Sequence, residues 1–206
     1  MFSTLLLATT CKEDNVEPDN TSGTFTDSRD GRTYNWQKIG DQVWMTENLA
    51  YLTEDSWAYN NETSNVDQYG LLYTWEAAQI AVPDGWHIAS DNEWKELQMF
   101  VGLSQVEANE EGWKGNQAKK LKSSLGWNDN GGGTDDYGFK AMGGGYYLGS
   151  GSFDLMGTSG MWWTSTEATE FSTSYAWLRQ MSANNDAIYR GRNDKSYGYS
   201  VRCVRD

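Results

Sequence analysis

Short runs of alternating apolar and polar residues open the first third of the chain. Between residues 24 and 45, Asp30-Gly31 and Gly40-Asp41 each separate runs rich in Thr, Tyr, Trp, Ile and Val. Gly beside Asp between two such runs is typical of a hairpin turn. The pattern therefore predicts three short strands, at residues 24–26, 33–39 and 42–45.

The middle of the chain changes to the apolar spacing of three and four residues that is typical of helices. QYGLLYTWEAAQIAV predicts one helix, which Pro83 and Gly85 end. A second helix follows Ser90, because Ser90 and Glu93 have the spacing of a capping box and an apolar face follows them. A third, shorter helix is predicted over residues 116–125, with Ala118, Leu121 and Leu125 facing inward.

Strand patterns dominate after Gly126, where Gly-rich loops separate short runs such as GMWWTSTE and SYAWLRQMS. In the second run, Trp177, Arg179 and Met181 should point to one side, and Leu178, Gln180 and Ser182 to the other. The chain closes on SYGYSVRCVRD, whose alternation predicts a strand inside the fold. Helices before strands favour an α+β domain with two or three helices on small antiparallel sheets.

Composition limits the partners. The chain has 206 residues, which is enough for one ordinary domain, and 16 Lys and Arg against 29 Asp and Glu. A net charge of −13 with no basic cluster repels phosphate backbones, so we expect no nucleic-acid partner. No apolar run is long enough for a membrane-spanning helix.

The N-terminus, MFSTLLLATTC, is a short apolar run that ends in small residues and Cys11. It resembles the end of a bacterial lipoprotein signal, and the following KEDN resembles the signal that sends lipoproteins of Bacteroidetes to the outer face of the outer membrane. We therefore expect a truncated signal peptide at 1–10, a tether at 11–23 lipidated on Cys11, and one domain at 24–206. Cys203 is then a buried free thiol; a Cys11–Cys203 disulfide is the alternative.

Catalytic patterns are sparse. His87 is the sole histidine, no G-x-S-x-G motif occurs, and Cys203 is the one cysteine of the domain. We expect a hydrogen-bonded structural role for His87 and no enzymatic activity. The loop NDNGGGTDD offers oxygen ligands for calcium in Asp129, Asp135 and Asp136, although Asn, Asp and Gly are also ordinary turn residues. We expect no cofactor, with calcium left open.

Seven blocks along the chain carry a family resemblance. DGRTYNWQKIGDQVWMTENLAY, YGLLYTWEAA, PDGWHIASDNEW, AKKLKSSLGW, GTDDYGF, WWTSTE and KSYGYSVRCVRD occur in this order. Together they resemble the Fibrobacter succinogenes major paralogous domain, a family of secreted or lipid-anchored bacterial domains. The resemblance implies a C-type-lectin-like fold, related to formylglycine-generating enzymes, in which the N- and C-terminal strands pair and the last strand enters the main sheet. The cysteine pair common in the family is absent, since Tyr59 and Asn65 occupy that loop.

Residues 174–202 also resemble the C-terminal variable region of proteins diversified by retroelements, in which framework positions alternate with free ones. The free positions implied here are Leu178, Gln180, Ser182, Tyr189, Gly191, Arg192, Asp194 and Tyr197. Apart from Gly191, they would form a surface of aromatic, charged and small polar groups, similar in composition to an antibody paratope. Most tryptophans should instead be structural, namely Trp36, Trp44, Trp75, Trp86, Trp94 and Trp163.

The sequence thus predicts a cell-surface, outer-membrane lipoprotein that binds an extracellular glycan or protein through this C-terminal surface. Two alternatives remain, a structural surface protein without a specific ligand and an unrecognised enzyme of the same fold.

Overall fold

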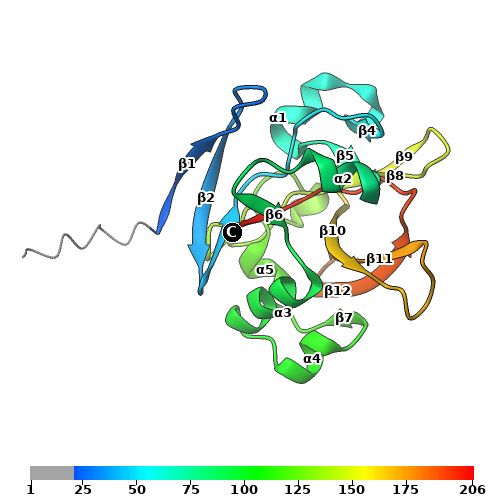
Figure 1. The fold of residues 1–206 in the computed structure, drawn as a ribbon. Helices are drawn as coiled ribbons and strands as arrows, with labels where there is room; N and C mark the ends of the chain where they lie inside the picture. The colour runs from blue at the N-terminus through cyan, green and yellow to red at the C-terminus, as the bar shows by residue number, and fades with distance from the viewer. Residues whose placement is uncertain (1–20) are drawn as a thin grey trace, which may run out of the picture.

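The computed structural model describes residues 21–206, which form two main sheets, antiparallel except for the β8–β10 pair, with short helices around and between them (Figure 1). The signal peptide at 1–10, the lipidation site Cys11 and the tether up to residue 20 lie outside the described residues. Strand β1 already begins at Ser22, so the last two residues assigned to the tether belong to the fold. The predicted α+β class is confirmed.

The first sheet has the strand order β1-β2-β3-β13-β6. The three strands predicted at its start are present, with a hairpin turn at residues 27–32 between β1 and β2. The bounds are β1 Ser22–Thr26, β2 Thr33–Ile39, β3 Gln42–Met45, β13 Cys203–Arg205 and β6 Trp86–Ile88.

The second sheet has the order β7-β12-β11-β10-β8-β9 and lies on the other side of the molecule in Figure 1. A two-stranded sheet, β4-β5, lies near its β8 end. The bounds are β7 Gly112–Lys114, β12 Asn185–Asp194, β11 Tyr175–Ser182, β10 Ser159–Glu167, β8 Gly144–Tyr147, β9 Phe153–Met156, β4 Ser56–Trp57 and β5 Leu72–Tyr73.

The helices are shorter than the sequence predicts. The helix predicted before Pro83 is confirmed only over its second half, because Leu72 and Tyr73 form a strand instead. The helix predicted at 116–125 covers four residues, and Leu125 is 72% exposed rather than inward. The bounds are α1 Val66–Tyr69, α2 Trp75–Ala81, α3 Asp91–Phe100, α4 Gln105–Asn109 and α5 Ala118–Leu121. None of the helices in residues 21–206 is long and apolar enough to cross a membrane.

Helix α3 begins as predicted. The Ser90 hydroxyl accepts from the backbone N–H of Glu93, and the Glu93 carboxylate accepts from the backbone N–H of Ser90 at 2.7 Å. This reciprocal pair satisfies backbone donors that an α-helix leaves open at its start. The helix then packs Trp94 and Leu97 into the core between the two main sheets.

Asp91, the first residue of α3, fastens the helix to the second sheet. Its buried carboxylate pairs with Arg179 of β11 and Arg190 of β12, both at 2.8 Å, and with Lys95 at 2.9 Å. Burial by itself would raise the pKa of Asp91, but the bonds from these three cations hold it well below its usual range. Breaking such a buried network leaves uncompensated charge in the core.

The last residues of the chain run between the sheets, and this accounts for the buried terminal strand. Gly198 exchanges backbone hydrogen bonds with Tyr147 of β8, and Tyr199 does so with Tyr73 of β5. Ser200 bonds to β10, and β13 then pairs with both β3 and β6. The predicted buried terminal strand is confirmed, but it pairs with the third strand rather than the first, because the hairpin turn places β1 at the sheet edge.

Arg202 is fully buried within this tail. Its guanidinium donates to the backbone oxygens of Met45 at 3.1 Å and Phe139 at 2.5 Å, and to the side-chain oxygen of Asn48 at 2.9 Å. The ring of Phe139 lies 4.5 Å from the guanidinium carbon. Cys203 beside it is a buried free thiol, as predicted.

His87 of β6 has the hydrogen-bonded structural role that the sequence indicates. Nδ1 lies 2.7 Å from the Asp206 carboxylate and Nε2 lies 2.6 Å from the Glu93 carboxylate. Partial burial lowers the pKa of His87, but the two carboxylates outweigh this effect and raise it above the ordinary value. The imidazolium thereby joins the start of α3 to the end of the chain.

We predict that Arg202→Met destabilises the protein by about 3 kcal/mol or more, because several buried oxygens lose their donor. Urea unfolding followed by tryptophan fluorescence measures this. Arg205→Met is the matched control, because Arg205 lies partly exposed between Trp36 and Trp86 and should cost about 1 kcal/mol or less. Equal losses in the two variants would contradict the structural role of Arg202.

We predict that His87 stabilises the fold at acidic pH and less so at alkaline pH. A raised folded-state pKa means that the stabilisation is complete below the unfolded value near 6.5 and is lost as pH rises through the folded value. The melting temperature of the native chain should therefore exceed that of His87→Gln at pH 6, and the two values should converge as pH rises to 9. A gap in melting temperature that widens with pH would contradict this.

Candidate functional site

The two faces of the second sheet are covered to different extents by the rest of the protein. One face packs against α3 and the central core through Trp162, Met181 and Ile188. The other face carries a smaller cluster formed by Trp163 and Leu178, with Trp75 of α2 and Tyr199 of the tail lying over them. Half-buried side chains surround this smaller cluster, so part of the face remains open to solvent.

We name this open part the aromatic face and define it by six residues. Their shared property is a half-buried or exposed side chain on the side of the sheet that carries Leu178 and Trp163. They are Trp113, Tyr146, Met161, Gln180, Tyr189 and Tyr197.

Four residues joined as three cross-strand pairs form the centre of the aromatic face. In the register of β10, β11 and β12, Met161 lies opposite Gln180 and Gln180 lies opposite Tyr189. Tyr189 in turn lies opposite Trp113 of β7, and the two rings are 5.3 Å apart. One apolar, one amide and two aromatic side chains therefore form a row across four neighbouring strands.

The ring of Tyr189 lies along its own strand. A Cβ atom at Gly191 would be 2.3 Å from a Tyr189 ring carbon, closer than any real contact. The ring therefore lies over the position that the glycine leaves empty, and Trp113 borders it on one side. An aromatic side chain held in this way presents surface without losing much conformational entropy on binding.

A second group of rings continues from this row. Tyr146 and Tyr197 stack with centroids 6.4 Å apart, and Tyr197 stacks on Tyr199 at 6.2 Å. The Tyr199 hydroxyl accepts from the Asn193 amide at 2.5 Å. Burial raises the pKa of Tyr199 and of Tyr146, so both phenols are neutral at physiological pH.

The polar groups of the aromatic face are neutral amides and hydroxyls. The Gln180 amide donates to the Ser159 hydroxyl at 3.0 Å, which fixes its orientation and leaves its oxygen as an acceptor. A surface of fixed aromatic rings with amide and phenol groups between them can stack on a sugar ring or receive a protein side chain.

Of the ligand-binding residues predicted from sequence, the structure brings Gln180, Tyr189 and Tyr197 together on this face. The prediction that Leu178 and Ser182 face solvent is wrong, because these residues are 4% and 7% exposed. Trp75 and Tyr199 cover Leu178, which therefore belongs to the small core cluster. Ser182 lies where β11 turns into β12, and its hydroxyl accepts from the backbone of Asn184.

Arg192 and Asp194 do not join the aromatic face. Continuous pairing places Arg192 opposite Trp177, on the other side of the sheet from Tyr189. Its guanidinium pairs with Glu111 and lies 3.2 Å from the centre of the Phe171 ring. The Asp194 carboxylate accepts from the backbone and the hydroxyl of Ser196, so it stabilises the turn after β12.

The calcium candidates do not gather into a site. Within residues 21–206, no three His, Cys, Asp or Glu side chains are placed to hold a metal ion together. Asp135 instead accepts from the backbone N–H of Lys140 at 2.8 Å, while Asp129 and Asp136 are exposed. The geometry of these residues therefore gives calcium no support.

Cys203 does not have the surroundings of a reactive thiol. Burial raises its pKa to about 12, so the thiolate is scarce at neutral pH. It is the first residue of β13, and its side chain is buried in the core.

Sequence reasoning missed Trp113, Tyr146 and Met161. Met161 lies in a run predicted as a strand, whereas Tyr146 lies in a run expected to be a Gly-rich loop and no strand was predicted at Trp113. No local pattern shows which strands become neighbours. The Gly-rich runs around Tyr146 were the one available signal, because glycine in a strand indicates close approach of another chain segment.

Comparison with protein families finds a match to the Fibrobacter succinogenes major domain over residues 37–205. Searches of curated proteins and of solved structures return no match. The matched segment includes the whole second sheet with the aromatic face, and the first sheet apart from β1 and the start of β2. The chain therefore belongs to the Fibrobacter succinogenes major domain family.

Proposed function

We propose that this protein is a binding module that captures an extracellular glycan or protein on the aromatic face. Binding is passive, because the fold holds the contact groups in place before the ligand arrives. The proposed setting is the bacterial cell surface, with a lipid on Cys11 as the anchor and residues 11–21 as the spacer.

The fixed orientation of Tyr189 is the observation that carries this proposal. Its ring lies over Gly191, Trp113 borders it, and Gln180 stands beside it in the next strand. An exposed aromatic ring with no partner would ordinarily turn toward the core or sample several rotamers. Here the neighbouring positions hold a partly exposed ring on the sheet.

The positions of the aromatic face also differ in how far they can vary. Gln180, Tyr189 and Tyr197 are only partly covered, so other side chains at these positions would change the surface and leave the core in place. Leu178 is buried, and Gly191 makes room for the Tyr189 ring. This division supports a recognition surface that is adjustable at a few positions on a constant scaffold.

We predict that Tyr189→Ala and Gln180→Ala each weaken ligand binding, about tenfold or more for the tyrosine, because the ring is a central rigid contact. The purified full-length chain is screened on glycan and extracellular-protein arrays, and each hit is then titrated with the variants. The class of the hits decides between glycan and protein.

Tyr175→Ala is the matched control, because Tyr175 is an exposed tyrosine of β11 on the opposite side of the sheet. Its affinity should stay within about twofold of the native chain. Binding that survives Tyr189→Ala but fails in Arg192→Ala would move the site to the other side and refute the proposal. Silence on broad arrays would favour a structural surface protein.

We predict that Cys11→Ser abolishes lipidation. Cells that express the native protein or the Cys11→Ser variant are grown with a labelled fatty acid, and the label should appear in the native protein alone. The protein should also move from the membrane fraction to the soluble fraction. Continued labelling of Cys11→Ser would reject the anchor.

A further inference from the structure

A groove of about 490 Å³ lies between β4 and helix α1, and none of the residues of the aromatic face lines it. Its walls are mainly apolar, with Leu52, Trp57, Ala58, Val66 and Leu71 among them. Ala58 and Leu71 are buried and belong to the core, whereas Leu52 is 72% exposed. The groove therefore has a fixed apolar floor and an exposed aliphatic side chain at its edge.

The ring of Trp57 is fixed in the wall of this groove. It stacks on Tyr147 with ring centroids 4.0 Å apart, and Tyr147 in turn contacts Phe153 of β9. The loop that follows is held by Asn65, whose amide donates to the backbone oxygen of Tyr59 at 3.0 Å. The groove is therefore part of the rigid fold.

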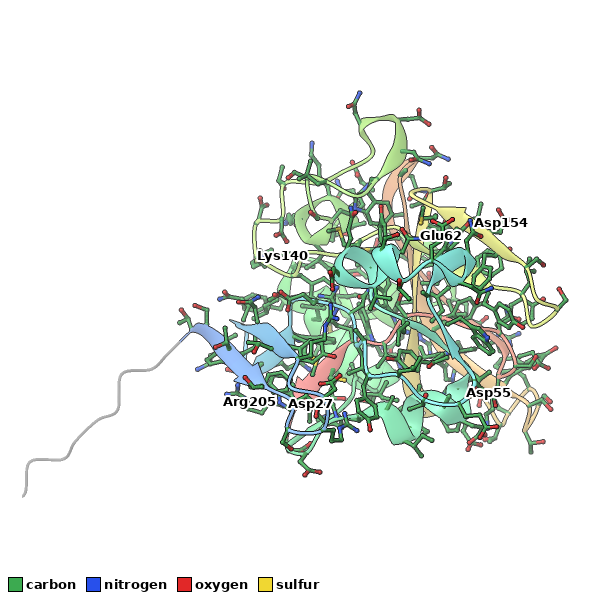
Figure 2. All side chains as sticks on the ribbon, turned by 90° about the horizontal axis from the view of Figure 1, so that it is seen from above. Asp27, Asp55, Glu62, Lys140, Asp154 and Arg205 are labelled. Atoms are coloured by element: carbon green, nitrogen blue, oxygen red, sulfur yellow. The ribbon has the colours of Figure 1, made fainter. Side chains whose placement is uncertain are left out.

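Acidic side chains outnumber basic ones around the groove, although Arg32 bonds to its wall at Val66 and Asp67. Residues 39–86 contain no Lys, Arg or His. Glu54, Asp55, Glu62 and Asp67 lie in the segments that form the groove, and all four are exposed; Figure 2 labels Asp55 and Glu62 on these segments. Asp67 pairs with Arg32 at 3.2 Å, while the other three form no ion pair within residues 21–206.

The apolar walls and the exposed carboxylates together favour some classes of ligand over others. An acyl chain with an anionic head group would fit the apolar walls but would be repelled by the acidic edge. A sugar would find few free hydrogen-bonding groups, since most of the wall surface is apolar, Asp67 pairs with Arg32 and the Ser56 hydroxyl bonds to Thr53. An apolar side chain flanked by cations satisfies both the walls and the edge.

We propose that the β4–α1 groove binds a cationic peptide segment, with one bulky apolar side chain in the groove and Lys or Arg residues against Glu54, Asp55 and Glu62. This site is independent of the aromatic face. The peptide is bound as an extended segment, so that residues on both sides of the apolar side chain can reach these carboxylates.

The test uses the full-length chain and a labelled heptapeptide with Leu at its centre and three Lys on each side, followed by fluorescence anisotropy. We expect saturable binding that weakens as salt rises. Peptides with Ser at the centre, or with Glu in place of Lys, should bind at least about tenfold more weakly. Equal binding of the Ser peptide would overturn the proposal, because the groove would then contribute nothing.

Two variants of the groove complete the test. Thr63→Trp places a bulky side chain at an exposed position of the wall and should block the Leu peptide. The triple variant Glu54→Gln, Asp55→Asn, Glu62→Gln should weaken binding about tenfold, since three attractive charges are removed together.

A second triple variant, Asp84→Asn, Asp136→Asn, Glu170→Gln, is the matched control. It removes the same charge from exposed acids that do not line the groove, and should change the affinity less than about twofold. Equal weakening by the two triple variants would show attraction to overall negative charge and overturn the site. Far-ultraviolet circular dichroism confirms that each variant is folded.

Discussion

The backbone of residues 198–205 holds the two halves of this domain together. Within eight residues it bonds to β8, to β5, to β10, to the loop after β3, and finally to β3 and β6. An extended segment inside a protein must pair every amide, and here the partners come from all three sheets. The relative position of the sheets is therefore set by one strand-like segment.

Buried charged side chains also fix the position of the two main sheets and of α3 relative to one another. Arg202 bonds to oxygens that belong to the first sheet and to the loop at residues 139–140, while Asp91 joins α3 to β11 and β12. Buried groups of this kind tolerate few alternatives, because any displaced partner leaves an unsatisfied charge or carbonyl. The aromatic face lies on strands that these contacts hold, which gives a recognition surface with little freedom of its own.

Local patterns in the sequence predicted those elements that depend on local interactions. The hairpin at β1–β2, the capped start of α3 and the alternation of β11 all follow from residues close together in the chain. The buried framework tryptophans were predicted as well, and Trp44, Trp94 and Trp163 are fully buried. The family resemblance is confirmed, since the family match covers most of the chain.

The errors arise where distant segments decide the outcome. Alternation in β11 correctly placed Leu178 and Trp177 on opposite sides of the sheet. It could not show that α2 and the tail would cover the side that carries Leu178. Arg192 was grouped with Tyr189 because both lie in one stretch, although their odd spacing in a regular strand places them on opposite sides. Tyr146 and Met161 entered the site through sheet order, which a single sequence does not reveal.

The position of β13 between β3 and β6 also has a consequence for biosynthesis. The partners Trp44 and Val204 lie 160 residues apart, so the first sheet closes only after nearly the whole chain has emerged from the ribosome. Until then, β3 and β6 each have an unpaired edge that another chain could occupy. The slow step of folding should therefore be closure of this gap by the tail.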